Sequence, residues 1–193
     1  MDIRLKLFRY RSYTPLPFLL VMLVFAHPTL YTLIAGLFFV LTGECIRLWG
    51  VSIVGSETRT TGTVGGTYLI TTGPFGYVRN PLYLGNLLLY LGIGVMSNAL
   101  FPWLVVAATV LFFIQYYLII TLEEEYLEKT FRSAFEDYSR QVRRFLPVLR
   151  KYSAPGSQRV DSDFRRALRS EKRTLQGLFL ISLALVVLWK VRS

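Results

Sequence analysis

Apolar residues in this chain gather in long runs, and charged residues gather between them. Residues 29–54 contain two charged side chains, whereas residues 82–96 and 99–122 contain none. A membrane-spanning helix needs about 20 predominantly apolar residues, so 29–54 and 99–122 each have sufficient length. The run 82–96 reaches that length if its helix carries Pro81 in the first turn, where a backbone N–H has no helical partner, and continues to Ser97.

Two further apolar runs are shorter. Residues 15–26 and 178–189 each cover little more than half the length of a span. Either run is compatible with a short span, a re-entrant hairpin or an interfacial helix. The pattern therefore predicts an all-α integral membrane protein with four to five transmembrane helices. These would form two helical hairpins and a C-terminal amphipathic and apolar helix.

Composition agrees with a membrane protein. Of the 193 residues, 53% are hydrophobic, which is high for a soluble domain. The basic residues before the first apolar run resemble the start of a secretory signal peptide. No small-x-small cleavage site follows them, and a second apolar run begins almost at once. We therefore expect a retained first membrane helix.

The net charge of +10 is distributed in a way that predicts orientation. Lys and Arg are concentrated in residues 1–12, 47–79 and 123–175, whereas the turns at 27–28 and 97–98 have none. Cytoplasmic loops carry such an excess, so we expect the N-terminus and any active site to face the cytoplasm from a bacterial inner membrane. Positive charge that follows the loops favours membrane lipids as partners over nucleic acid.

The chain has one cysteine, Cys45, and one histidine, His27. An intrachain disulfide is therefore impossible. A typical zinc site or a Cys–His catalytic pair needs more such residues. We expect neither a metal site nor a metal partner.

The chain divides into three parts. Residues 1–54 form the N-terminal transmembrane hairpin. Residues 55–147 hold a Gly- and Thr-rich loop, the second hairpin and a charged helix over 123–145, where apolar positions recur at helical spacing. Residues 148–193 form a basic linker and a membrane-associated helix. The loop lacks both G-x-G-x-x-G and G-x-x-x-x-G-K-[ST], so we expect no Rossmann domain and no P-loop.

Polar residues with candidate chemistry lie where the second hairpin meets water. Arg79 precedes one apolar run and would bind a carboxylate or phosphate with two parallel hydrogen bonds. Tyr83 follows one helical turn later, on the same face. The alternatives are a snorkelling arginine and a tyrosine of the interfacial aromatic belt.

Acidic residues supply the other candidates. Glu123, Glu124 and Glu125 follow the next apolar run, and at least one of them should face only water. Glu44 lies inside an apolar run, which makes it a functional candidate by default. An ion pair with Arg47, three residues later, is the alternative interpretation.

Three ordered blocks resemble one known family. They are GPFGYVRNPLYLG at 73–85, EEEYL at 123–127 and VRRFLP at 142–147. Together they are similar to the isoprenylcysteine carboxyl methyltransferase family of integral membrane enzymes, a pattern shared with membrane phospholipid methyltransferases. The resemblance covers about residues 40 to 147, and Arg47-Leu48-Trp49 resembles bacterial members.

The resemblance implies S-adenosyl-L-methionine as cofactor, held by membrane helices. It also implies a set of cofactor-binding residues, with Arg79, Tyr83 and Glu124 acting in catalysis as well. By position these are Thr67, Tyr68, Leu69, Ile70, Phe75, Arg79, Asn80, Pro81, Tyr83, Glu123 and Glu124.

Two positions depart from the family pattern. Asn80 stands where the family usually has histidine, although an amide also donates hydrogen bonds. Ile119 stands where the eukaryotic enzymes have a substrate-binding arginine, four residues before the glutamate pair. The second difference argues against a prenylcysteine carboxylate as the substrate.

We therefore expect a methyltransferase that acts on a lipid-embedded or amphiphilic acceptor. O-methylation of a carboxylate would need no general base. N- or S-methylation of a phospholipid or small amphiphile is the alternative, and an amine would need a base such as Glu44 or Glu124. A non-enzymatic membrane scaffold with a lipid-binding basic tail is the alternative of another class. The sequence leaves the acceptor unnamed.

Overall fold

The computed structural model describes residues 2–55, 68–153 and 161–192. Within these ranges all regular structure is helical, which confirms the all-α prediction. The elements, in chain order, are α1 (Ile3–Tyr10), α2 (Leu16–Val24), α3 (Leu30–Val54), the 3₁₀ turn η2 (Gly73–Gly76), α4 (Pro81–Ser97), α5 (Trp103–Phe131), α6 (Ser133–Gln141) and α7 (Phe164–Arg192).

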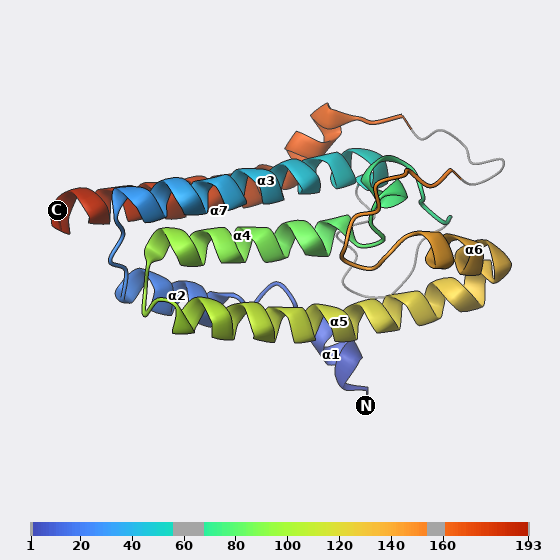
Figure 1. The fold of residues 1–193 in the computed structure, drawn as a ribbon, viewed down its shortest axis with the longest axis horizontal. Helices are drawn as coiled ribbons and strands as arrows, with labels where there is room; N and C mark the ends of the chain where they lie inside the picture. The colour runs from blue at the N-terminus through green and yellow to red at the C-terminus, as the bar shows by residue number, and fades with distance from the viewer. Residues whose placement is uncertain (1, 56–67, 154–160, 193) are drawn as a thin grey trace.

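The four long helices lie side by side along one axis (Figure 1). Helix α4 lies between α3 and α7 on one side and α5 on the other, and it contacts all three. By length and composition, α3, α5 and α7 are each able to cross a membrane, and α4 is a shorter apolar helix. Their apolar side chains are widely exposed on the outer faces, as in Phe38, Val110 and Leu180. The molecule therefore has the architecture of a membrane-embedded helical bundle.

The two shorter apolar runs have different outcomes. Residues 178–189 belong to α7, whose 29 residues are enough for a full span. Residues 15–26 form α2, whose 9 residues extend only about 14 Å and cannot cross a bilayer alone. Helix α7 contacts α3 over much of its length, and Arg192 near its end donates a hydrogen bond to the Ala26 carbonyl.

Helix boundaries follow local chemistry. Thr29 and Thr32 form a capping box at the start of α3, in which each side chain bonds the other residue's backbone N–H. Pro81 occupies the first turn of α4, as its sequence predicts. Asn98 ends α4 in the left-handed conformation, which asparagine tolerates better than most residues.

Glycines allow α3 and α4 to pack with their backbones in close contact. A Cβ added at Gly36 would lie 2.4 Å from the Gly92 carbonyl oxygen, and one added at Gly43 would lie 2.7 Å from the Gly85 carbonyl oxygen. Only residues without a side chain fit at such crossings. The register of α3 against α4 is therefore fixed by this seam, which positions the start of α4.

The predicted continuous helix over 123–145 is wrong in two respects, because it is interrupted and because α6 already ends at Gln141. The helix breaks at Arg132, whose φ of 44° lies in the left-handed region, and α6 begins at Ser133. The break turns Phe135 and Tyr138 of α6 inward, where they pack with Val142 and Tyr152 in a second small core. Burial of these side chains overrides the helical periodicity of the sequence.

Candidate active site

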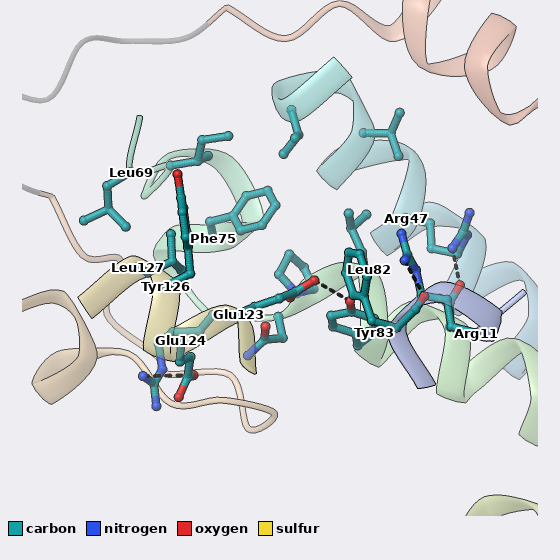
Figure 2. A pocket seen from close by; sticks show the side chains of 18 of the residues that line it. Arg11, Arg47, Leu69, Phe75, Leu82, Tyr83, Glu123, Glu124, Tyr126 and Leu127 are labelled. Carbon is teal, nitrogen blue, oxygen red and sulfur yellow. Dashed lines mark hydrogen bonds and ion pairs between the residues drawn. The ribbon is translucent and has the colours of Figure 1, made fainter. Parts of the chain in front are cut away.

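A cavity of about 710 Å³ opens at the end of the bundle where α4 begins and α5 extends toward α6. Its volume lies within the range of roughly 300–1,000 Å³ that small-molecule sites occupy. Residues from α1, α3, α4, α5, α6, α7 and the segment 68–80 line it. Figure 2 shows part of its wall.

Most of the predicted site residues meet in this cavity. Its lining includes Tyr68, Leu69, Ile70, Phe75, Arg79, Asn80, Pro81, Tyr83, Glu123 and Glu124. Thr67 lies outside the described residues. Glu44 is not among the lining residues.

Glu124 is held between two arginines. Arg79 Nη1 lies 3.1 Å from Glu124 Oε1, and Arg144 donates to Glu124 Oε2 through Nε at 2.8 Å. Arg144 Nη2 lies 2.7 Å from the same oxygen, and its guanidinium stacks over the Tyr117 ring. This arrangement joins α5 to the segment before α4 and to the segment after α6 in one charged cluster.

Two buried polar atoms of this charged cluster have no hydrogen-bond partner among the described residues. Glu124 is only 8% exposed, and burial lowers the pKa of Arg79, an effect that the charge of Glu124 opposes. Among the described residues, Arg79 Nε has no hydrogen-bond partner, and Glu124 Oε1 has only the 3.1 Å contact with Arg79 Nη1, which lacks hydrogen-bond geometry. Buried polar atoms without partners are costly, so both atoms are suited to a polar ligand.

Glu123, the neighbour of Glu124, bonds a residue outside this charged cluster. It accepts a hydrogen bond from the Tyr83 hydroxyl at 2.7 Å, and Figure 2 shows this contact in the middle of the cavity wall. The Tyr83 ring packs against Tyr116, with 4.9 Å between ring centroids. Tyr83 therefore has a fixed orientation and in turn orients Glu123.

The segment before α4 is fastened to the segment after α6 by backbone hydrogen bonds. The Arg79 amide donates to the Arg143 carbonyl at 2.9 Å, and the Tyr152 amide donates to the Gly76 carbonyl at 2.9 Å. The Tyr138 hydroxyl donates to the Phe75 carbonyl at 2.7 Å. These bonds hold Phe75 in the cavity wall beside Leu69, at the end that Figure 2 shows farthest from Arg47.

Asn80 is positioned by the same contact between segments. Its side-chain amide donates to the Arg144 carbonyl at 3.3 Å. Asn80 therefore ties the start of α4 to the segment after α6, beside Arg79.

Glu44 belongs to a separate buried cluster. It lies 3.3 Å from Arg47 Nε, so the ion pair considered as the alternative from sequence is present. Arg47 also bonds Asn86 of α4 and Glu171 of α7, and these three residues line the cavity. The cluster joins α3, α4 and α7 around one guanidinium.

Several lining residues were missed from sequence. Arg47 was expected as a partner for Glu44 and as part of the family resemblance, not as a lining residue of the site. Glu171 lies in a basic stretch, 124 residues from its partner, and its one signal is that it is an acid among bases. Phe8 lies in α1 and Arg11 directly follows it, and the place of α1 beside α5 depends on tertiary packing.

Comparison with known proteins identifies the family. A family model described as phospholipid methyltransferase matches residues 31–134, which is more than half of the chain. The chain belongs to the phospholipid methyltransferase family. The match includes α4, α5 and all of α3 except Leu30, and therefore Arg79, Tyr83, Glu123 and Glu124 of the cavity. This phospholipid methyltransferase family member is thus related to membrane methyltransferases in general.

Two relatives of this family member carry names from metal resistance. The cobalt-zinc-cadmium resistance protein CzcN of Cupriavidus metallidurans is 31% identical over 159 residues, which are 77% of this chain and 68% of CzcN. The nickel-cobalt-cadmium resistance protein NccN of Alcaligenes xylosoxydans xylosoxydans is 31% identical over 103 residues, 53% of this chain and 47% of NccN. The second match thus spans about half the length of that relative. No solved structure matches the chain.

Proposed function

We propose that this protein is an S-adenosyl-L-methionine-dependent methyltransferase that acts on a lipid-embedded or amphiphilic acceptor. The observation that carries the proposal is the convergence of Phe75, Arg79 and Glu124 on one cavity at the end of a membrane bundle. Family membership supports methyl transfer, and the apolar outer surface supports an acceptor that arrives from the lipid.

The residues of the cavity fit the cofactor by charge. S-adenosyl-L-methionine carries a carboxylate, an amine, a sulfonium and an adenine ring, and it supplies the methyl group when bound. Arg79 Nε is a buried donor without a partner and suits the carboxylate, while Glu124 Oε1 suits the amine or a ribose hydroxyl. Phe75 and Tyr126 offer ring faces to adenine and sulfonium.

The protein's contribution to such a reaction is mainly alignment and the exclusion of water. Transfer of a methyl group from a sulfonium is an in-line displacement, and a fixed geometry accelerates it. Tyr83 and Glu123 are held by their mutual hydrogen bond, and Arg79 by its backbone bond to Arg143. We place this site at the cytoplasmic face, because the basic residues of 123–153 and 161–175 lie at this end of the bundle.

The names of the two relatives add a cellular role that can be tested. Within the described residues, no group of three or more His, Cys, Asp or Glu side chains is placed to hold a metal ion. We therefore propose that any contribution to metal resistance depends on the methyltransferase cavity. Loss of resistance in cells that carry Arg79→Ala, at equal protein level, would support this link.

Isothermal titration of the detergent-purified protein with S-adenosyl-L-methionine and S-adenosylhomocysteine tests the function. We expect saturable binding by the wild type and binding at least 10- to 100-fold weaker in Arg79→Ala, since hydrogen bonds between charged groups contribute about 1.5–3 kcal/mol each. The matched control is Arg140→Ala, because Arg140 pairs with Glu136 on the surface and its side chain is 69% exposed.

The opposite result also has a clear meaning. If folded wild-type protein binds neither compound, the methyltransferase proposal fails and the membrane scaffold becomes the better explanation. Folding is checked independently by size-exclusion chromatography and by a cooperative thermal transition, so a failure to bind is not confused with a failure to fold.

A further inference from the structure

We propose that Glu123 is the proton acceptor of the methyl transfer, and that the acceptor's nucleophile therefore arrives carrying a proton. This inference rests on the proposed function and makes it more specific. It gives Glu123 and Glu124 different roles, whereas the family resemblance assigns both residues to the cofactor.

Three consecutive glutamates have three different environments. Glu124 is paired with two arginines, as described above. Glu125 points away from the cavity and pairs with Arg4 of α1, with 49% of its side chain exposed. Glu123 lines the cavity, and its recorded hydrogen bond comes from a neutral group, the Tyr83 hydroxyl. No ion pair of Glu123 is recorded among the described residues.

A carboxylate with a neutral donor is suited to accept a proton. Two arginines stabilise the negative charge of Glu124 and oppose its protonation. Glu123 has one oxygen bonded to Tyr83, which leaves acceptor positions of its carboxylate for a proton from the cavity. Arg11 lines the same part of the wall, and its positive charge favours the ionised Glu123 carboxylate, which is the form that accepts a proton. Its guanidinium also stacks on Phe8 and donates to the Phe8 carbonyl.

The other carboxylates near the cavity are less suitable. Glu44, considered as a base from sequence, is not among the lining residues and lies against Arg47. Glu171 lines the cavity but is bonded to the same arginine. Among the described residues that line the cavity, Glu123 is thus the glutamate without a recorded arginine partner.

The position of Glu123 in the cavity also fits the role of proton acceptor. In Figure 2 the Glu123 side chain lies between Phe75 at one end of the cavity and Arg47 at the other. A cofactor bound near Phe75 and Arg79 and an acceptor that enters toward Arg47 would meet beside this carboxylate. A general base must be within hydrogen-bond reach of the proton that it removes.

The step balances as follows for an amine. The ammonium of the acceptor gives one proton to the Glu123 carboxylate and becomes a neutral amine. The nitrogen lone pair then forms a bond to the methyl carbon while the carbon–sulfur bond breaks, and its electron pair stays on sulfur. The product is a methylammonium, S-adenosylhomocysteine and a protonated Glu123, which returns its proton to water. A hydroxyl or a thiol would transfer its proton in the same way.

This assignment selects a substrate class. A carboxylate acceptor has no proton to lose, and its negative charge would be repelled by Glu123. Together with Ile119, which replaces the family's substrate-binding arginine, this favours amphiphiles with a protic nucleophile over fatty or prenylated carboxylates.

Labelled methyl transfer to four probes of equal chain length tests the proposal: dodecylamine, dodecanethiol, dodecanol and dodecanoate. The full chain is assayed in lipid nanodiscs as wild type, Glu123→Gln and the matched neighbour Glu125→Gln. We expect the wild type to methylate at least one protic probe, and Glu123→Gln to lower kcat by about 100- to 10,000-fold, the usual contribution of general acid–base catalysis. Cofactor affinity should stay within about threefold in both variants, and Glu123→Asp should restore part of the rate.

Three results would overturn the inference while leaving the proposed function intact. In the first, the protein binds the cofactor and methylates dodecanoate but none of the protic probes. In the second, it binds the cofactor but methylates no probe. In the third, Glu123→Gln has the same rate as the wild type. Loss of cofactor affinity in Glu123→Gln would also overturn it, since Glu123 would then belong to the cofactor site. Absence of cofactor binding by the wild type would instead reject the proposed function itself.

Discussion

At the scale of single residues, the cavity depends on how each charge is paired. Glu124 is held from two sides, and one of its arginines comes from the segment after α6. That arginine, Arg144, also stacks on Tyr117, so the cluster is anchored to α5 twice. The sequence block VRRFLP contains two adjacent arginines, and the structure distinguishes them: the Arg143 side chain is exposed, whereas Arg144 is half-buried against Glu124.

Arg143 and Arg144 are adjacent in sequence, so replacing each by Ala gives a matched pair of variants. Replacing Arg144 by Ala should weaken cofactor binding about 10-fold, because Glu124 loses the partner that orients it. Replacing Arg143 by Ala should change binding less than about twofold, since only its backbone carbonyl contacts Arg79. Isothermal titration of the two variants measures the difference. Equal effects in both would mean that net charge, not the contact with Glu124, matters here.

At the scale of helices, the close seam between α3 and α4 determines where α4 begins. Sequence patterns predicted both helices because long apolar runs and a proline at the first turn are local signals. The break at Arg132 was not predictable in this way. Its left-handed backbone is stabilised by the packing of Phe135 and Tyr138 against Tyr152, which is remote in sequence. The contact between Arg47 and Glu171 was not predictable for the same reason, because it also depends on tertiary packing.

The close packing of α3 and α4 predicts that a glycine-to-alanine substitution has different effects on stability at two positions. An alanine Cβ at Gly92 would lie 2.7 Å from the Gly36 carbonyl oxygen, so Gly92→Ala should destabilise the bundle by about 1–3 kcal/mol. Gly177 in α7 has nothing within 4 Å of such a Cβ, and Gly177→Ala should be neutral or stabilising by up to about 1 kcal/mol. Thermal unfolding in detergent compares them. A Gly92→Ala variant as stable as the wild type would contradict the close packing.

At the scale of the whole molecule, the cavity lies where α4 begins, and the C-terminal end of α7 lies at the opposite end of the bundle (Figure 1). Most of the basic residues outside the helices follow α5, near the cavity, and the turn before α3 has none. The positive-inside rule therefore predicts a cytoplasmic cavity and an external α2–α3 turn. The length of α7, which the sequence left open, adds the prediction that the C-terminal end of α7 lies on the external side.

Cysteine labelling tests this orientation in intact cells. In a Cys45→Ser background, a membrane-impermeant maleimide should label His27→Cys, whose side chain is exposed in the α2–α3 turn. Leu149→Cys, exposed near the cavity, should react only after the cells are permeabilised. The reverse pattern would place the cavity outside the cell and would exclude a cytoplasmic cofactor supply.

The Arg47 cluster also has a consequence for how the protein is made. Helix α3 is synthesised and inserted long before α7, so Arg47 must first enter the membrane without Glu171. An arginine at the centre of a span costs roughly 2.5–3.5 kcal/mol on insertion, and Arg47, which lies between the centre and the C-terminal end of α3, costs less. Glu44, one helical turn away, is the partner available at that time. The last helix then brings Glu171 to the same guanidinium and closes one wall of the cavity. The cavity is therefore completed only after α7 has been synthesised, and a chain interrupted before α7 would hold an anchored bundle with an unfinished cavity.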